Sequence, residues 1–169
     1  MRKIFLSIIF LILFSEIKSQ ESVKARALAE IIQVLTATET SQLNFGRFSP
    51  ETQGGKIVLS SDGVRTSEGS IILVSSLYNS GSFYLTGEYD ATFTITLPSA
   101  PEYIENDVSH KTMKIDNWRT YSVNDNSGIY KLDKGSAIVR VGADLNVGNM
   151  IENPVGIYRG TYSITFSYN

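Results

Sequence analysis

The chain has 169 residues, 42% of them hydrophobic and 19% charged, with 15 basic residues against 17 acidic ones and no cysteine. Without cysteine it cannot use a thiol nucleophile, bind metal through thiolates or carry a lipid on a cysteine. The basic residues neither outnumber the acidic ones nor cluster, which argues against nucleic acid or an anionic membrane surface as the main partner.

The first 19 residues have the layout of a cleavable secretory signal. Two basic residues open it, residues 4–14 are apolar apart from one serine, and a more polar stretch follows. This apolar run is shorter than the roughly 20 residues of a membrane-spanning helix. We therefore expect cleavage between Ser19 and Gln20, and a mature protein that does not span a membrane and resides in the periplasm, at the cell surface or in the medium.

Residues 20–169 are enough for one domain. Because the signal holds three basic residues and one acidic residue, this part keeps 12 basic and 16 acidic residues, a net charge of −4. It contains no linker, low-complexity tract or internal repeat. Short alternating runs are separated by Gly, Asn, Asp or Pro, as in a sandwich or barrel of many short strands. The pattern predicts a single all-β domain over residues 20–169.

The segment Glu21–Leu35 fits more than one structure. Every fourth residue from Val23 to Leu35 is apolar, as on one face of a helix, and its composition favours a helix. Every second residue from Val23 to Ile31 is also apolar, as on one face of a strand. Residues 21–31 could therefore be a helix, the first strand of the domain, or a segment that adds to the sheet of another chain.

Several strands are predicted in the middle of the chain. The runs Lys56–Ser60 and Ser70–Ser75 are apolar on both faces, which indicates central strands covered on each side. Asp62-Gly63 between them signals a tight turn. Further strands are predicted over residues 82–87, 92–97 and 111–118, and turns or loops over residues 124–128, 133–135 and 149–156.

Three runs alternate clearly. Phe93, Ile95 and Leu97 share one face of the run 92–97, opposite threonines. The odd-numbered residues from 137 to 147 are all apolar, whereas the opposite face carries Arg140, Asp144 and Asn146 and is expected to face solvent. From residue 158 to 168, aromatic and apolar side chains alternate with polar ones in the same way. We expect the following side chains from these runs to be buried: Phe93, Ile95, Val139, Val141, Ile164 and Phe166.

A series of short motifs runs along the chain in a fixed order. They are LNFG at 43–46, SGSFYLTG at 80–87, ITLP at 95–98, MKI at 113–115, VGADLNV at 141–147 and GIYRGTY at 156–162. Together they resemble the bacterial exported family catalogued as domain of unknown function 4402, over essentially the whole chain after the signal. The resemblance implies an immunoglobulin-like antiparallel β-sandwich of Gram-negative bacteria with kinship to fimbrial and adhesive subunits. It implies no catalytic residues, and it favours a strand from Ile31 onward.

The residue pattern contains no recognisable catalytic or metal site. The single histidine, His110, lies in a polar stretch where we expect a solvated loop, with no second histidine to share a metal. The acidic residues Asp62, Asp90, Glu102 and Glu105 lack the spacing of a calcium loop. No serine has the Gly-x-Ser-x-Gly surroundings of a hydrolase nucleophile. We therefore assign no catalytic, metal or cofactor-binding residue and predict that the protein is not an enzyme.

Aromatic residues are the remaining signal for ligand binding. Exposed rings of Trp118, Tyr121, Tyr103 and Tyr130 could stack on a sugar, although tyrosines on strands more often pack half-buried with a wet hydroxyl. We expect a non-catalytic protein of the envelope or cell surface, acting in adhesion or pilus-like assembly with other subunits through its sheet edges. The alternative is a carbohydrate- or ligand-binding module. A small outer-membrane barrel is disfavoured, because threonines, Arg140 and Asp144 occupy the outer faces.

Overall fold

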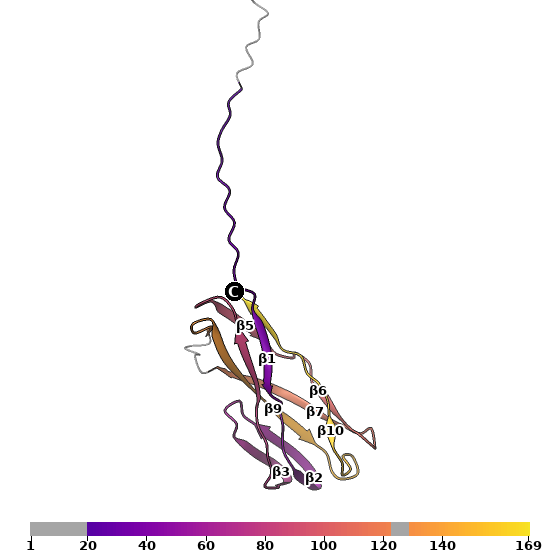
Figure 1. Ribbon diagram of the computed structural model, residues 1–169. Coiled ribbons are helices and arrows are strands. Elements are labelled where there is room, and N and C mark those ends of the chain that lie inside the picture. Colours follow the sequence, from indigo (N-terminus) through magenta and orange to yellow (C-terminus); the bar gives the residue numbers. More distant parts are fainter. Residues whose placement is uncertain (1–19, 123–128) are drawn as a thin grey trace, which may run out of the picture. The chain divides into compact units, whose positions relative to one another are not determined.

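The computed structural model describes residues 20–122 and 129–169. The predicted signal peptide (1–19) and the predicted turn over 124–128 lie outside the described residues. The described chain divides into an N-terminal segment, residues 20–31, and a β-domain, residues 32–169. The N-terminal segment forms neither helix nor strand (Figure 1). The helix considered over residues 21–35 is therefore wrong, and the first strand begins at Thr36 rather than Ile31.

The β-domain consists of antiparallel strands, and no described residue belongs to a helix long and apolar enough to cross a bilayer. In chain order the strands are β1 (Thr36–Ser41), β2 (Phe48–Leu59), β3 (Arg65–Leu73), β4 (Gly81–Thr86), β5 (Thr92–Thr96), β6 (Glu102–Asn106), β7 (Thr112–Ser122), β8 (Tyr130–Lys131), β9 (Ser136–Val147), β10 (Tyr158–Arg159) and β11 (Thr165–Tyr168).

Two sheets form the β-domain. The larger sheet has eight strands and curls, and it runs in the order β1-β4-β9-β7-β6-β10. Strand β9 is its centre, because one edge of β9 pairs with β7 and the other is shared by β4 and β2. Strand β3 extends the sheet beyond β2. The smaller sheet has the order β11-β5-β8.

The central position of β9 follows from its alternation. Its odd-numbered side chains from Ala137 to Val147 are at most 4% exposed, as the sequence predicts. They contribute to two hydrophobic clusters, one between β2, β7 and β9 and one where β4 and β9 pack against the smaller sheet. Trp118 contacts both clusters. The all-β fold and the buried face of β9 are thus confirmed.

Two predictions about solvent exposure are wrong. Asp144 is 1% exposed rather than solvated, because Lys56 and Arg119 from the neighbouring strands cover it with ion pairs. The run 70–75 is not a covered central strand, because β3 pairs only with β2 within the described chain and Ile72 is 54% exposed.

The predicted turns have the expected backbone. Asp62-Gly63 connects β2 to β3, and Gly63 has a φ of 92°. Lys134 and Gly135 both have positive φ, 50° and 82°, as a two-residue hairpin turn requires before β9. Residues 149–156 form a loop as predicted.

The C-terminal run differs from the single strand that was predicted. Its side chains alternate between half-buried and exposed from residue 158 to 168, but only its two ends are strands. Strand β10 pairs with β6 of the larger sheet, and β11 pairs with β5 of the smaller one. The residues between them leave one sheet and reach the other. We call residues 158–168 the C-terminal run.

Candidate functional site

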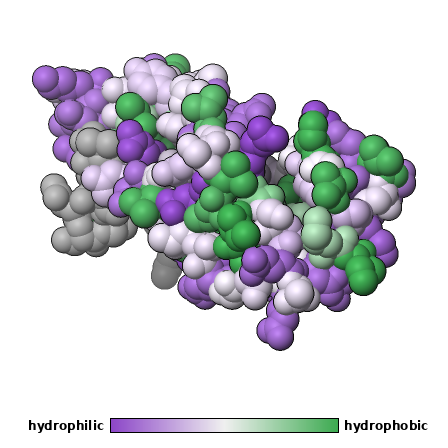
Figure 2. Space-filling view, turned by 90° about the horizontal axis from the view of Figure 1, so that it is seen from below, coloured by the Kyte–Doolittle hydropathy of each residue, from purple (hydrophilic) through white to green (hydrophobic). Residues whose placement is uncertain are grey.

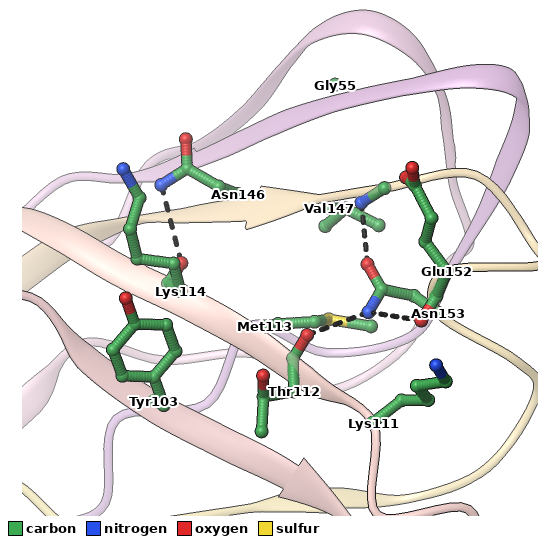
Figure 3. A pocket seen from close by; sticks show the side chains of 11 residues that line it. Gly55, Tyr103, Lys111, Thr112, Met113, Lys114, Asn146, Val147, Glu152 and Asn153 are labelled. Carbon is green, nitrogen blue, oxygen red and sulfur yellow. Dashed lines mark hydrogen bonds between the residues drawn. The ribbon is translucent and has the colours of Figure 1, made fainter.

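A polar pocket of about 390 Å³ lies where the loop after β9 meets β6 and β7 (Figure 3). Tyr103, Lys111, Lys114 and Glu152 line it. Tyr103 is 55% exposed, so its ring is accessible at the pocket.

The amide side chains of this pocket already have partners within the protein. Asn153 accepts a hydrogen bond from the Gly148 N–H at 2.6 Å and donates to the Thr112 carbonyl at 2.9 Å. Asn146 donates to the Asp116 carboxylate at 3.0 Å. Asn153 holds the loop after β9 against β7, and Asn146 joins β9 itself to β7. They perform a structural task, which leaves few groups to orient a ligand.

A charged network surrounds Asp144 on the outer face of the larger sheet. The carboxylate lies 2.8 Å from Arg119 Nη2 and 3.3 Å from Lys56 Nζ, and it accepts a hydrogen bond from the Asn117 amide at 3.0 Å. Hydrogen bonds to Glu68 and Asp144 raise the pKa of Lys56. Asn117 and Arg119 belong to a bulge of β7, where the register against β9 shifts. The network therefore fixes the bulge, and its charged groups are engaged with one another, although Arg119 Nη1 is buried without a hydrogen-bond partner among the described residues.

The acidic residues and the histidine singled out in the sequence do not converge. His110 and Glu105 bond to one another at 2.6 Å on the surface, and Asp90 pairs with Lys131 at 3.4 Å. Asp62 lies in the β2–β3 turn, where the Ser60 hydroxyl donates to it and lowers its pKa. Among the described residues, no three His, Asp or Glu side chains are grouped as metal ligands would be.

The four aromatic candidates separate into two pairs. Trp118 is half-buried and stacks on Tyr162 with ring centroids 4.8 Å apart. Tyr130 is half-buried, lies 5.7 Å from the Phe93 ring and shares a hydrogen bond with Thr120. These two rings pack against the interior, as aromatic residues on strands more often do, and are not free to stack on a sugar. Tyr103 and Tyr121 remain exposed, at 55% and 45%.

Hydrophobic side chains also reach the surface at one end of the β-domain. Figure 2 shows this end from below, where hydrophobic residues form several separate patches among polar ones. A hollow of about 600 Å³ lies beside Thr52, Met150 and Ile151. The patches on this face are divided, so they do not form one continuous docking surface.

A different kind of surface lies where β1 meets the C-terminal run. Within the described residues, β1 pairs only with β4, β10 only with β6 and β11 only with β5. Each therefore has one edge without a partner strand. The free edge of β1 and the free edge of the C-terminal run are close to one another. The Tyr168 hydroxyl donates to the Gln33 carbonyl at 2.9 Å, and β1 and β11 lie side by side near the C-terminus in Figure 1. We call this pair of edges the open seam.

The inner face of β1 is uncovered at the open seam. Ala37 and Glu39 are the cross-strand partners of Leu85 and Phe83, both members of the core, so they point to the core side. Yet residues 36–40 are exposed on both faces. A strand whose core-facing residues are exposed has nothing packed over it.

The opposite side of the seam is incompletely covered as well. Phe166 contacts Phe83 with ring centroids 5.7 Å apart, but Ile164 and Phe166 are only half-buried. Ile95, beside them on β5, is also half-buried. The prediction that these three side chains are buried holds only in part. The side chains that are less buried than predicted all lie on the face that borders the open seam.

Gly81 at the start of β4 and Gly87 just after its end leave room for tyrosine side chains of the C-terminal run. A Cβ at Gly81 would lie 2.6 Å from the Tyr162 hydroxyl, and a Cβ at Gly87 would collide with the Tyr168 hydroxyl. Burial, followed by the charge of Glu39, raises the pKa of Tyr162 to about 12. These contacts hold the C-terminal run close to β4. The outer edge of the C-terminal run has no partner strand among the described residues.

The register shows which backbone groups face the seam. The Asn169 N–H donates to the Thr92 carbonyl at 3.2 Å, which fixes the phase of the β11–β5 ladder. Because antiparallel residues alternate between bonded and non-bonded pairs, Thr165 and Ser167 bond to β5. The N–H and C=O groups of Phe166 and Tyr168 then point to the free edge. Sequence patterns could not identify this edge, since pairing depends on strands far apart in the chain.

A family model described as a domain of unknown function (DUF4402) matches residues 35–168. The chain belongs to this family, as its motifs indicated. No curated protein and no solved structure matches the chain.

Proposed function

We propose that this DUF4402 protein is a non-catalytic, exported subunit of the bacterial envelope or surface that assembles with other protein subunits through the open seam. The observation that carries the proposal is that, among the residues that the structure describes, both edges of the seam lack a partner strand while their core-facing side chains are half-buried or exposed. An extended segment placed there would bond to free N–H and C=O groups and cover apolar surface.

The same observation favours an immunoglobulin-like sandwich that is one strand short. The three-stranded sheet packs on one half of the larger sheet, and the seam lies at the border of the two. A further strand at the seam would join β1 to the C-terminal run and close this border. Pilus-like assembly and adhesion both require subunits that join firmly to one another, and completion of a neighbour's sheet is a strong way to do so.

Carbohydrate binding is the weaker alternative. Its support is the exposed Tyr103 at the polar pocket, since an accessible ring can stack on a sugar. The amides beside it hold the loop after β9, and Trp118 and Tyr130 are interior residues.

A matched pair of substitutions on β1 tests assembly through the seam. Ala37 and Thr38 are both exposed neighbours, but Ala37 points to the core side and Thr38 pairs with Tyr84 on the outer face. In the chain that begins at Gln20, Ala37→Lys should weaken self-association by about 100-fold or more, because the ammonium would be buried under the incoming strand. Thr38→Lys, with the same charge, should leave it within about twofold. Sedimentation over a concentration series measures both.

Both variants should remain folded, since each side chain is exposed in the single chain. Self-association of the Ala37→Lys chain equal to that of the Thr38→Lys chain would show that the seam is not the interface.

A further inference from the structure

We propose that the segment that fills the open seam is residues 21–31 of a second copy of this chain. This inference rests on the proposed function, because it names the occupant of the same seam. It makes the protein a subunit that donates its N-terminal segment to one neighbour and accepts the segment of another.

The pattern of the segment fits an added strand. From residue 23 to residue 31 its odd-numbered residues are Val23, three alanines and Ile31, so a strand would present one face of mostly small apolar side chains after Glu21. Lys24, Arg26 and Glu30 would lie on the opposite face, in solvent. The segment forms no helix or strand, and Val23 and Ile31 are 80% and 99% exposed. Its backbone groups are therefore available for pairing.

The dimensions of segment and seam agree. The segment 21–31 and the C-terminal run 158–168 each contain 11 residues, so one extended strand can follow the whole run. Phe83 lies opposite Glu39 of β1, Tyr162 and Phe166 lie in the C-terminal run, and all three are half-buried. Alanine can cover a half-buried ring without adding the volume of a large side chain.

The residues that follow the segment favour its pairing with the seam of a second copy rather than with the seam of its own chain. To lie beside β1 of the same chain, the segment would have to reverse direction at residues 32–35, just before β1 begins. These are Ile-Gln-Val-Leu, with none of the Gly, Pro, Asn or Asp residues that tight turns use. Gln33 is also held at both backbone groups, by Glu88 Oε2 at 2.9 Å and by the Tyr168 hydroxyl at 2.9 Å.

The donated segment and the accepting seam are different surfaces of one chain. An interface of this kind is head-to-tail, and it propagates into an open chain of subunits unless the rotation between subunits closes a ring. The proposal therefore predicts that a single kind of subunit can grow into a linear assembly.

The test uses one donor variant and one acceptor variant of the chain that begins at Gln20. Ala27→Asp places a carboxylate on the apolar face of the segment, and Ala37→Lys blocks the seam. Each variant alone should lose self-association, by about 100-fold or more for a buried unpaired charge. An equal mixture should form a one-to-one heterodimer, because the Ala37→Lys chain still has an intact segment and the Ala27→Asp chain an intact seam.

Leu28→Asp is the matched control. It adds the same charge at the next residue and removes a larger hydrophobic side chain, but it alters the solvent face. Its self-association should stay within about threefold of the wild type. If nonspecific hydrophobic contact drove association, Leu28→Asp would instead be the more damaging change, which would overturn the proposal.

The remaining outcomes separate the two proposals. If Ala37→Lys abolishes association and Ala27→Asp does not, another segment fills the seam, so this inference fails while the proposed function stands. If neither variant affects association, both fail. A wild type that stays monomeric at every soluble concentration overturns the inter-copy proposal. In that case a lower melting temperature of the Ala27→Asp monomer would show that the segment pairs within its own chain.

Discussion

Side chains of one hydrophobic face of the smaller sheet are buried to different degrees. Phe93 on β5 is 1% exposed, whereas Ile95, Ile164 and Phe166 are only half-buried. All four have the same alternating pattern in the sequence, so the pattern identifies the face but not its coverage. Coverage depends on whether a further strand lies over the face, which is a property of strand pairing.

This difference predicts unequal costs of truncation in the monomer. Phe93→Ala should reduce the free energy of unfolding by about 3–5 kcal/mol, because it empties a closed part of the core. Phe166→Ala should cost only about 1–2 kcal/mol, because part of the ring is already in contact with water. Urea denaturation of the two monomeric variants measures both values. Equal losses would mean that Phe166 is as well covered as Phe93 and that the seam is closed.

Strands were predictable where alternation and burial coincide. Strands β5 and β9 follow this rule. The turn at Asp62-Gly63 was predictable for a different reason, because its residue types favour a tight turn. The start of strand β1 was predicted at Ile31, five residues too early and from the family resemblance alone, because Thr36–Ser41 carries polar residues on both faces and is held by its pairing with β4 rather than by burial. The C-terminal run was read as one strand, since its alternation is continuous although β6 and β5 divide its pairing.

The candidate site was predictable only in outline. The alternating apolar residues of the segment 21–31 indicated an added strand as one of three possibilities. The position of the accepting edge required the order of strands in the sheets. The burial of Asp144 could not be foreseen either, because its partners Lys56 and Arg119 come from β2 and β7, far from it in the chain.

The charged network predicts how the β7 bulge is stabilised. Asp144→Ala should lower the free energy of unfolding by about 2–3 kcal/mol, because it leaves two cations without their shared buried carboxylate. Asp144→Asn keeps the shape and an acceptor for Asn117, so its cost should be smaller. Asp90→Ala, which breaks a surface pair with Lys131, should cost less than about 1 kcal/mol. Thermal unfolding compares the three, and a loss at Asp144→Ala no greater than at Asp90→Ala would refute this role.

In the β-domain as a whole, strand pairing is complete around β9, whereas outer strands such as β3 and β1 have a single partner strand within the described residues. The central strand has partners along both edges, and its inward side chains are closed from solvent. At the open seam, two edges and their inner faces lack a neighbour within the described residues. Free edges of this kind are usually blunted by charge, proline or a covering segment. Here the inner face of β1 carries one such charge, Glu39, but within the described residues it has no proline and no covering segment, which is why we propose that the seam serves assembly.

Amide hydrogen exchange of the chain, compared between its monomeric and associated forms, addresses this assignment at single backbone groups. The N–H groups of Phe166 and Tyr168 point to the free edge, whereas those of Thr165 and Ser167 bond to β5 in the single chain. On association, exchange at Phe166 and Tyr168 should slow by about tenfold or more, because a new strand bonds to them. Exchange at Thr165 and Ser167 should change far less. Association that leaves the Phe166 and Tyr168 amides as unprotected as in the monomer would contradict assembly through the open seam.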